Sequence, residues 1–91
     1  ATIDVVVEEE GLEEFVNVTF TIYPNPAKDI INIISNAQAY EYQMINSLGQ
    51  VVLEGVSSGE NTISVANMKN GIYFLRLVSD DEMSINKITI Q

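Results

Sequence analysis

The residues that could carry acid–base or metal chemistry in this sequence are its carboxylates. The chain of 91 residues has 13 Asp and Glu, four Lys and Arg, and neither Cys nor His. Ser-His-Asp and Cys-His catalysis and zinc binding through Cys or His are therefore excluded. What remains is carboxylate chemistry, either general acid–base catalysis or the binding of a hard cation such as Ca²⁺.

Nearly all of these carboxylates fall in charge runs or turns. Residues 8–14 contain a run of glutamates, and Asp80-Asp81-Glu82 forms a second acidic cluster. Contiguous acids in a turn are normally solvated, and no Asp-x-Asp-x-Asp-Gly calcium loop is present. We therefore predict no catalytic residue, no metal site and no cofactor, and we expect that the chain is not an enzyme.

The net charge of −9 argues against polyanionic partners. The four basic residues are Lys28, Lys69, Arg76 and Lys87. Phosphate backbones and anionic membrane surfaces would repel such a chain, so we expect no nucleic acid and no membrane among its partners. No apolar run approaches the roughly 20 residues that cross a bilayer. Because the first residue is Ala1 instead of Met, we interpret the chain as a piece of a longer polypeptide.

Alternation of apolar and polar residues predicts β-strands throughout the second part of the chain. Val16, Val18, Phe20 and Ile22 point one way and the polar residues between them point the other way, which indicates a half-buried strand. Similar segments follow at short intervals, separated by turn residues. The predicted strands are 16–22, 30–34, 40–46, 51–54, 62–65, 72–79 and 84–91.

The same alternation predicts the core and the turns. Gly49 fits a turn position with positive φ, and residues 55–61 are interpreted as a polar loop. Asn70-Gly71 and the acidic cluster after residue 79 mark two further turns. The residues expected to point inward are Ile31, Ile33, Ile63, Val65, Tyr73, Leu75, Leu77, Ile88 and Ile90.

Seven closely spaced strands without a convincing helix predict an all-β fold, an immunoglobulin-like antiparallel β-sandwich. This domain is predicted over 15–91. Residues 1–14 are interpreted as an N-terminal strand, 2–7, followed by an acidic linker. In the isolated protein the strand 2–7 is expected to add to a sheet edge of a second molecule, which would give a homodimer.

The segment Tyr23-Pro24-Asn25-Pro26-Ala27 is predicted to be a rigid turn. Its two prolines fix two φ angles and remove two backbone donors, and they hold Asn25 between them. Three further segments follow in the chain, each a common pattern by itself. They are Asn-Ser-Leu-Gly-Gln-Val-Val at 46–52, Asn-Gly-Ile-Tyr-Phe-Leu-Arg-Leu at 70–77 and Asn-Lys-Ile-Thr-Ile-Gln at 86–91.

In this order and spacing, the four segments resemble the C-terminal sorting domain of the type IX (Por) secretion system, over residues 20–91. The family's second basic residue near the end has no counterpart here, where only Lys87 is basic. The family's fold is an immunoglobulin-like sandwich, in agreement with the strand count. The positions that match its motifs, and that the resemblance implies are recognition residues, are Pro24, Asn25, Pro26, Gly49, Gly71, Tyr73, Lys87, Ile88 and Ile90.

The resemblance implies a secretion and sorting signal that is fused behind an N-terminal cargo domain. Such cargo crosses the inner membrane with a signal peptide, folds in the periplasm and passes the outer membrane through a translocon that recognises the domain. A sortase-like peptidase then removes the domain and attaches the cargo to the cell surface, or the cargo is released. We expect the processing site in the acidic stretch 8–14, because proteases cut exposed linkers.

Two alternatives come from other classes of protein. An immunoglobulin-like carbohydrate-binding or adhesive module would show several exposed aromatic side chains on one face, whereas Tyr40 and Tyr42 are expected to be packed. A structural spacer would need no special C-terminus. We favour the sorting signal, and we expect the export machinery to bind the final strand, with Lys87 projecting outward and Ile88 and Ile90 in the core.

Overall fold

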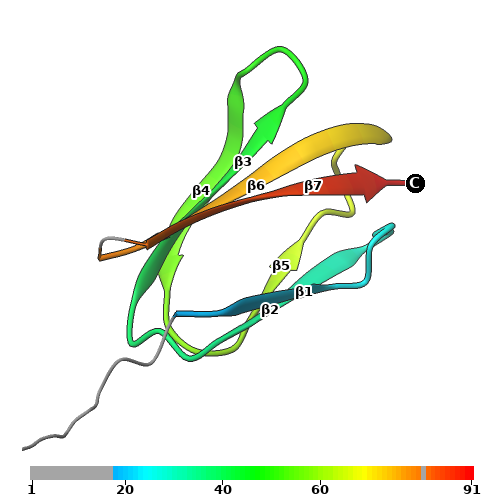
Figure 1. Ribbon diagram of the computed structural model, residues 1–91. Coiled ribbons are helices and arrows are strands. Elements are labelled where there is room, and N and C mark those ends of the chain that lie inside the picture. Colours follow the sequence, from blue (N-terminus) through cyan, green and yellow to red (C-terminus); the bar gives the residue numbers. More distant parts are fainter. Residues whose placement is uncertain (1–17, 81) are drawn as a thin grey trace, which may run out of the picture.

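The computed structural model describes residues 18–80 and 82–91, which form two antiparallel β-sheets packed face to face (Figure 1). One sheet has the order β1-β2-β5, and its strands are β1 (Phe20–Tyr23), β2 (Ile30–Ser35) and β5 (Asn61–Ser64). The other has the order β4-β3-β6-β7, and its strands are β3 (Tyr40–Asn46), β4 (Val51–Ser57), β6 (Gly71–Ser79) and β7 (Glu82–Ile90). The predicted all-β sandwich of seven strands is confirmed.

The strand order is that of an immunoglobulin-like sandwich with one edge strand moved. The chain passes from one sheet to the other between β2 and β3, between β4 and β5, and between β5 and β6. In the constant-type immunoglobulin domain the fourth strand pairs with the fifth, whereas here β4 pairs with β3. No helix in the described part of the chain is long and apolar enough to span a membrane.

The core lies between the sheets, where the alternating apolar residues of both inner faces meet. Each of the nine residues predicted to point inward is buried, and Ile31, Leu75 and Ile88 have no exposed surface. Val18, Phe20 and Ile22 cover the core from the β1 side, and the Phe20 ring meets the Tyr40 ring edge to face at 5.3 Å. The period-two pattern therefore identified the buried face of each sheet.

Most strand boundaries lie within one or two residues of the prediction, and two differ by three or more. Strand β1 begins at Phe20, and β4 continues to Ser57, through the first part of the predicted polar loop 55–61. Gly55 was interpreted as a loop glycine, but it pairs with Tyr42 across β3 and β4. The Tyr42 ring covers it so closely that a Cβ at this position would lie 2.6 Å from Tyr42 Cζ. Gly55 is thus a strand residue whose missing side chain makes room for an aromatic ring.

The turns follow the predicted chemistry. Gly49 has a φ of 85°, as expected for the turn between β3 and β4. The β6–β7 hairpin closes at the pair Ser79 and Glu82, with Asp80 at a φ of 51°. The predicted strand 2–7 and the acidic stretch 8–14 lie outside the described residues, so the domain boundary and the homodimer stay predictions.

Neighbouring isoleucines on β2 test the assignment of the two faces. Ile33 is fully buried, whereas Ile34 is 41% exposed. Ile33→Ala should lower the free energy of unfolding by about 2–5 kcal/mol, because it leaves a cavity in the core. Ile34→Ala should cost roughly 0.5 kcal/mol, as at other surface positions. Urea denaturation of both variants measures the difference, and equal losses would show that β2 does not present these faces.

Candidate functional site at the C-terminal end of the sandwich

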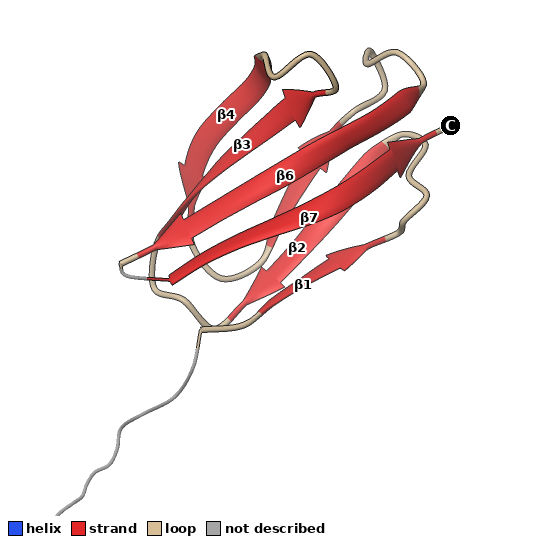
Figure 2. Ribbon diagram, turned by 45° about the horizontal axis from the view of Figure 1, so that its top comes forward, coloured by secondary structure: helices blue, strands red, loops and turns tan. Residues whose placement is uncertain are grey.

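Three segments that are far apart in the sequence meet where β7 ends (Figure 2). In the β6–β7 pair, Gly71 lies opposite Ile90 and Tyr73 lies opposite Ile88. On the other side of β7, Ala27 forms a parallel bridge with Ile90. The proline segment, the start of β6 and the end of β7 therefore form one continuous surface.

The side chain of Asn25 binds the outer edge of β7. Its Nδ2 donates a hydrogen bond to the carbonyl oxygen of Lys87 at 2.9 Å. The backbone N–H of Thr89 donates to Asn25 Oδ1 at 3.1 Å. A primary amide offers the same donor and acceptor as a peptide group, so Asn25 replaces a missing neighbour strand at this point.

Ala27 continues the same ladder through its backbone. Its N–H donates to the carbonyl oxygen of Thr89 at 2.7 Å, and its own carbonyl accepts from the N–H of Gln91 at 2.9 Å. Pro24 and Pro26, both preceded by cis peptide bonds, have no N–H, so these bonds are made through Asn25 and Ala27. We call the four bonds to Lys87, Thr89 and Gln91 the edge clamp.

Beneath this surface, Tyr73 and the two isoleucines of β7 fill the core. Tyr73 is 8% exposed, which confirms its predicted burial, and its hydroxyl donates to the carbonyl oxygen of Lys69 at 2.7 Å. Ile88 and Ile90 are buried as well. The side chain of Lys87 is exposed, as predicted. Strand β7 is thus held in place by the buried side chains of Tyr73, Ile88 and Ile90. Lys87 is the charged group that this end of β7 presents to solvent.

Of the nine residues predicted from the motifs, the structure brings eight together. They are the residues of the proline segment, of the start of β6 and of the end of β7. Gly49 lies apart from them, in the turn after β3, and no neighbouring atom would contact a Cβ at that position. Its positive φ explains the glycine by turn geometry alone.

The sequence interpretation missed the part that backbone groups play in this surface. Ala27 ends the proline segment, and no strand pattern in the sequence predicts a contact for it. It is 1% exposed and pairs with β7 on both its N–H and its C=O. A small residue directly after two prolines was the available signal, since a close backbone approach favours a small side chain.

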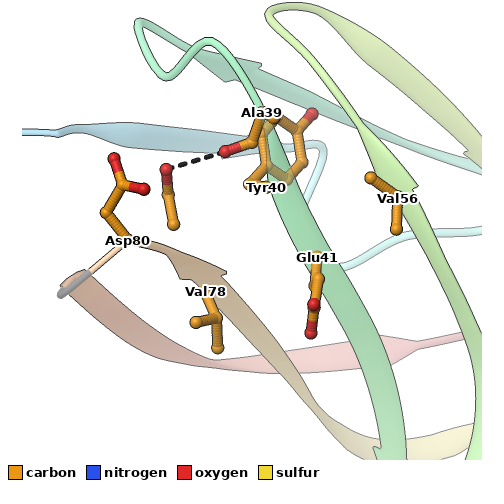
Figure 3. Close-up of a pocket in the computed structure, with 7 residues that line it drawn as sticks. Ala39, Tyr40, Glu41, Val56, Val78 and Asp80 are labelled. Carbon is orange, nitrogen blue, oxygen red and sulfur yellow. Dashed lines mark hydrogen bonds between the residues drawn. The ribbon is translucent and has the colours of Figure 1, made fainter.

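A shallow hollow lies at the opposite end of the sandwich, and it offers no catalytic arrangement (Figure 3). Its lining residues are Ala39, Tyr40, Glu41, Val56, Val78, Ser79 and Asp80. The Ser79 hydroxyl donates to the carbonyl oxygen of Ala39 at 2.7 Å, and the Tyr40 hydroxyl donates to the carbonyl oxygen of Gly59 at 3.1 Å. Burial raises the pKa of Tyr40. Both hydroxyls are thus engaged with backbone carbonyls, so they support the fold.

The described aromatic side chains do not form a binding platform. Tyr23 and Phe74 are the described aromatic residues with high exposure, at 43% and 38%. Tyr23 is on β1 in one sheet and Phe74 is on β6 in the other. Tyr40 is buried and Tyr42 is half-buried. The arrangement does not support the carbohydrate-binding alternative, which needs several aromatics on one face.

In a comparison with protein-family models, residues 21–91 match the secretion system C-terminal sorting domain. The chain belongs to this sorting-domain family. No curated protein matches the chain. The resemblance inferred from the four segments is thereby confirmed.

Membership of the sorting-domain family gives the chain its function. It is a C-terminal sorting signal for type IX secretion, and the family is one of sorting signals, not of enzymes. A sorting domain interacts with the secretion machinery and is fused to a cargo. It leads to export to the outer membrane, the cell surface or the medium.

The edge clamp predicts that Asn25 stabilises the sorting domain although it is exposed. Asn25→Ala removes two hydrogen bonds to β7 and should lower the free energy of unfolding by about 1–3 kcal/mol. Asn32→Ala is the matched control, because Asn32 accepts one hydrogen bond from the Thr62 hydroxyl on an outer face. Asn32→Ala should lower the free energy of unfolding by roughly 0.5 kcal/mol. Thermal and urea denaturation compare the two, and a neutral Asn25→Ala would refute the clamp.

Proposed function

We propose that the type IX translocon binds this domain at the C-terminal end of the sandwich. The proposed contact surface comprises the proline segment and the exposed groups of β7, with Lys87 as its charged residue. Pro24, Asn25 and Pro26 form the rim of this surface, and Gly71 is exposed beside it, opposite Ile90. The buried side chains of Tyr73, Ile88 and Ile90 support it from within. The observation that carries the proposal is the edge clamp, because it joins two of the family's motifs into one rigid surface.

The distribution of charge supports this choice of end. Lys28 follows the clamp residue Ala27, and Lys87 is on β7. The backbone carbonyl of Lys69 accepts the hydrogen bond of the Tyr73 hydroxyl. Asp29 is the acid that accompanies them in the sequence. Three of the four cationic residues thus lie near the end of β7, although the whole chain carries a charge of −9. The fourth, Arg76, lies in the middle of β6 and donates a hydrogen bond to Gln43 Oε1.

Four of the six described acids lie toward the other end of the sandwich. Asp29 is at the basic end, and Glu54 lies within β4 opposite Gln43. Glu41 pairs with Val78 near the end of β6, and Asp80 and Glu82 belong to the β6–β7 turn. Glu60 follows Gly59, whose N–H donates to the carbonyl oxygen of Ala37 before β3. A domain with one basic and one acidic end has a preferred orientation in the field of a charged partner. An acidic docking surface on the translocon would therefore select the end with the clamp.

The steps around this recognition follow from the same proposal. The cargo crosses the periplasm folded, with the domain attached, and the translocon passes it across the outer membrane. A sortase-like peptidase then acts on the exported protein, on the N-terminal side of the sandwich. In this scheme the domain is a substrate of export and processing, and it contributes no catalytic group of its own.

Fusion to a reporter tests the function and the role of Lys87 together. The chain is fused behind a reporter with a signal peptide, in a cell with the type IX system, and surface reporter is measured by antibody labelling of intact cells. The wild-type fusion should reach the surface. Lys87→Gln should reduce surface delivery several-fold with little change in melting temperature, because only the backbone of Lys87 takes part in the clamp.

Ser64→Glu is the control for net charge. It changes the charge by the same amount on the outer face of the other sheet, where Ser64 is exposed on β5, and it should leave export unchanged. Wild-type fusion that stays inside the cell would contradict the sorting function. Export of Lys87→Gln at the wild-type level would remove Lys87 from the contact surface.

A further inference from the structure

The two sheets have four edge strands in the described chain, and three of them are protected. Strands β1 and β5 have four residues each, and very short edge strands are one way in which native sheets avoid pairing with other chains. The pairing of β4 with β3 has a register shift, which falls between Met44 and Ile45 of β3. A shift of this kind bends an edge away from straight pairing. Strand β7 has nine residues, and its pairing with β6 is regular throughout.

The clamp shows which backbone groups of β7 point outward. It uses groups of Lys87, Thr89 and Gln91, which are alternate residues. In an antiparallel strand the N–H and C=O of one residue point to the same side, and successive residues point to opposite sides. The N–H and C=O groups of Met83 and Ile85, and the N–H of Lys87, therefore point outward too, along the half of the edge that the clamp leaves open.

The open half of β7 also exposes apolar side chains. Met83 is 57% exposed and Ile85 is 58% exposed. They lie on the outer face, opposite Val78 and Arg76 of β6. An unpaired backbone edge flanked by exposed apolar side chains is the arrangement that binds an extended peptide by strand addition.

We propose that the open half of the β7 edge, Met83–Lys87, binds an extended strand of a protein of the export machinery. This inference rests on the proposed function and names the contact that accompanies the recognition of Lys87. The bound strand has apolar residues at alternate positions, facing Met83 and Ile85. It has a basic residue beside Asp80 and Glu82, where the edge begins.

The clamp itself argues against a second copy of this chain as the occupant. In a two-fold antiparallel pair, each strand would have to lie along the other's edge. The groups of Lys87, Thr89 and Gln91 are already bound by Asn25 and Ala27 of the same molecule. Only the stretch Met83–Lys87 would remain for pairing, which is less than a stable dimer contact needs, whereas a transient contact during export can be smaller.

Charge argues against residues 2–7 of the same chain. That segment is followed by Glu8, Glu9 and Glu10, and the open edge begins beside Asp80 and Glu82. Like charges at close range oppose such pairing. A strand with basic residues, supplied by another protein, does not meet this repulsion.

Two substitutions at Ile85 test strand addition in the reporter fusion. Ile85→Pro removes an outward N–H and leaves the hydrogen bonds to β6 in place, because proline is tolerated where the N–H faces away from the ladder. Ile85→Lys keeps the backbone and replaces the apolar contact with a charge. The matched control is Ile34→Lys, which alters an exposed isoleucine on the other sheet.

Both Ile85 variants should lower surface delivery by about tenfold or more, while the melting temperature stays unchanged. The proline variant loses an edge hydrogen bond to the bound strand, and the lysine variant loses an apolar contact. Ile34→Lys should be exported like wild type. If the proline variant does not fold, the lysine variant decides the question.

Wild-type export of a folded Ile85 variant would overturn the inference while leaving the sorting function intact, because the wild-type fusion reports that function separately. Light scattering of the purified domain supplies a second criterion. A dimer that Ile85→Lys dissolves would assign the edge to a second copy and would also overturn the inference.

Discussion

The structure depends on how the outer edge of its last strand is completed. Strand β7 lies at the border of its sheet and pairs with a single neighbour, β6. Along the second half of that border, Asn25 and Ala27 of the β1–β2 connection supply the missing partners. Without them, the amides of Thr89 and Gln91 would lack protein acceptors. The clamp therefore joins the two sheets by hydrogen bonds at the end where the family's motifs meet.

Local patterns were sufficient to predict the sandwich. The alternation of residues such as Ile31 and Ile33 predicts all seven strands, and for β2, β5, β6 and β7 it also predicts the side that faces the core. Side chains alternate between the two faces of a strand, so this much can be inferred from neighbours in the sequence. The one misread loop, at Gly55, had a cause that pattern cannot show. A glycine in a strand is indistinguishable from a turn glycine until the tyrosine that covers it is placed.

The contacts of the candidate site could not be predicted in this way. Asn25 is 62 residues from Lys87 in the sequence, and no periodicity links them. The resemblance to a family grouped the proline segment with the terminal strand but gave no contact between them. The geometry adds the mechanism: two prolines remove competing donors, and the asparagine between them reaches across the gap between the sheets. Gly49, grouped by the same resemblance, is explained by its turn.

In the recognition that we propose, the machinery binds a rigid end that carries three lysines, and a strand edge that is closed in one half and open in the other. The closed half secures the terminal strand against exchange with neighbouring chains, which is a hazard for any exposed edge. The open half begins beside the acidic β6–β7 turn. The two ends of β7 therefore differ both in charge and in whether their outward backbone groups are already hydrogen-bonded.

Amide hydrogen exchange of the native domain tests the edge clamp most directly. The amides of Met83, Ile85, Thr89 and Gln91 all point toward the same edge, and the account predicts that only the last two are protected. Exchange at Thr89 and Gln91 should be slowed toward the rate of the amides paired with β6, and Asn25→Ala should release Thr89. Exchange at Thr89 and Gln91 as fast as at Met83 and Ile85 would contradict the clamp.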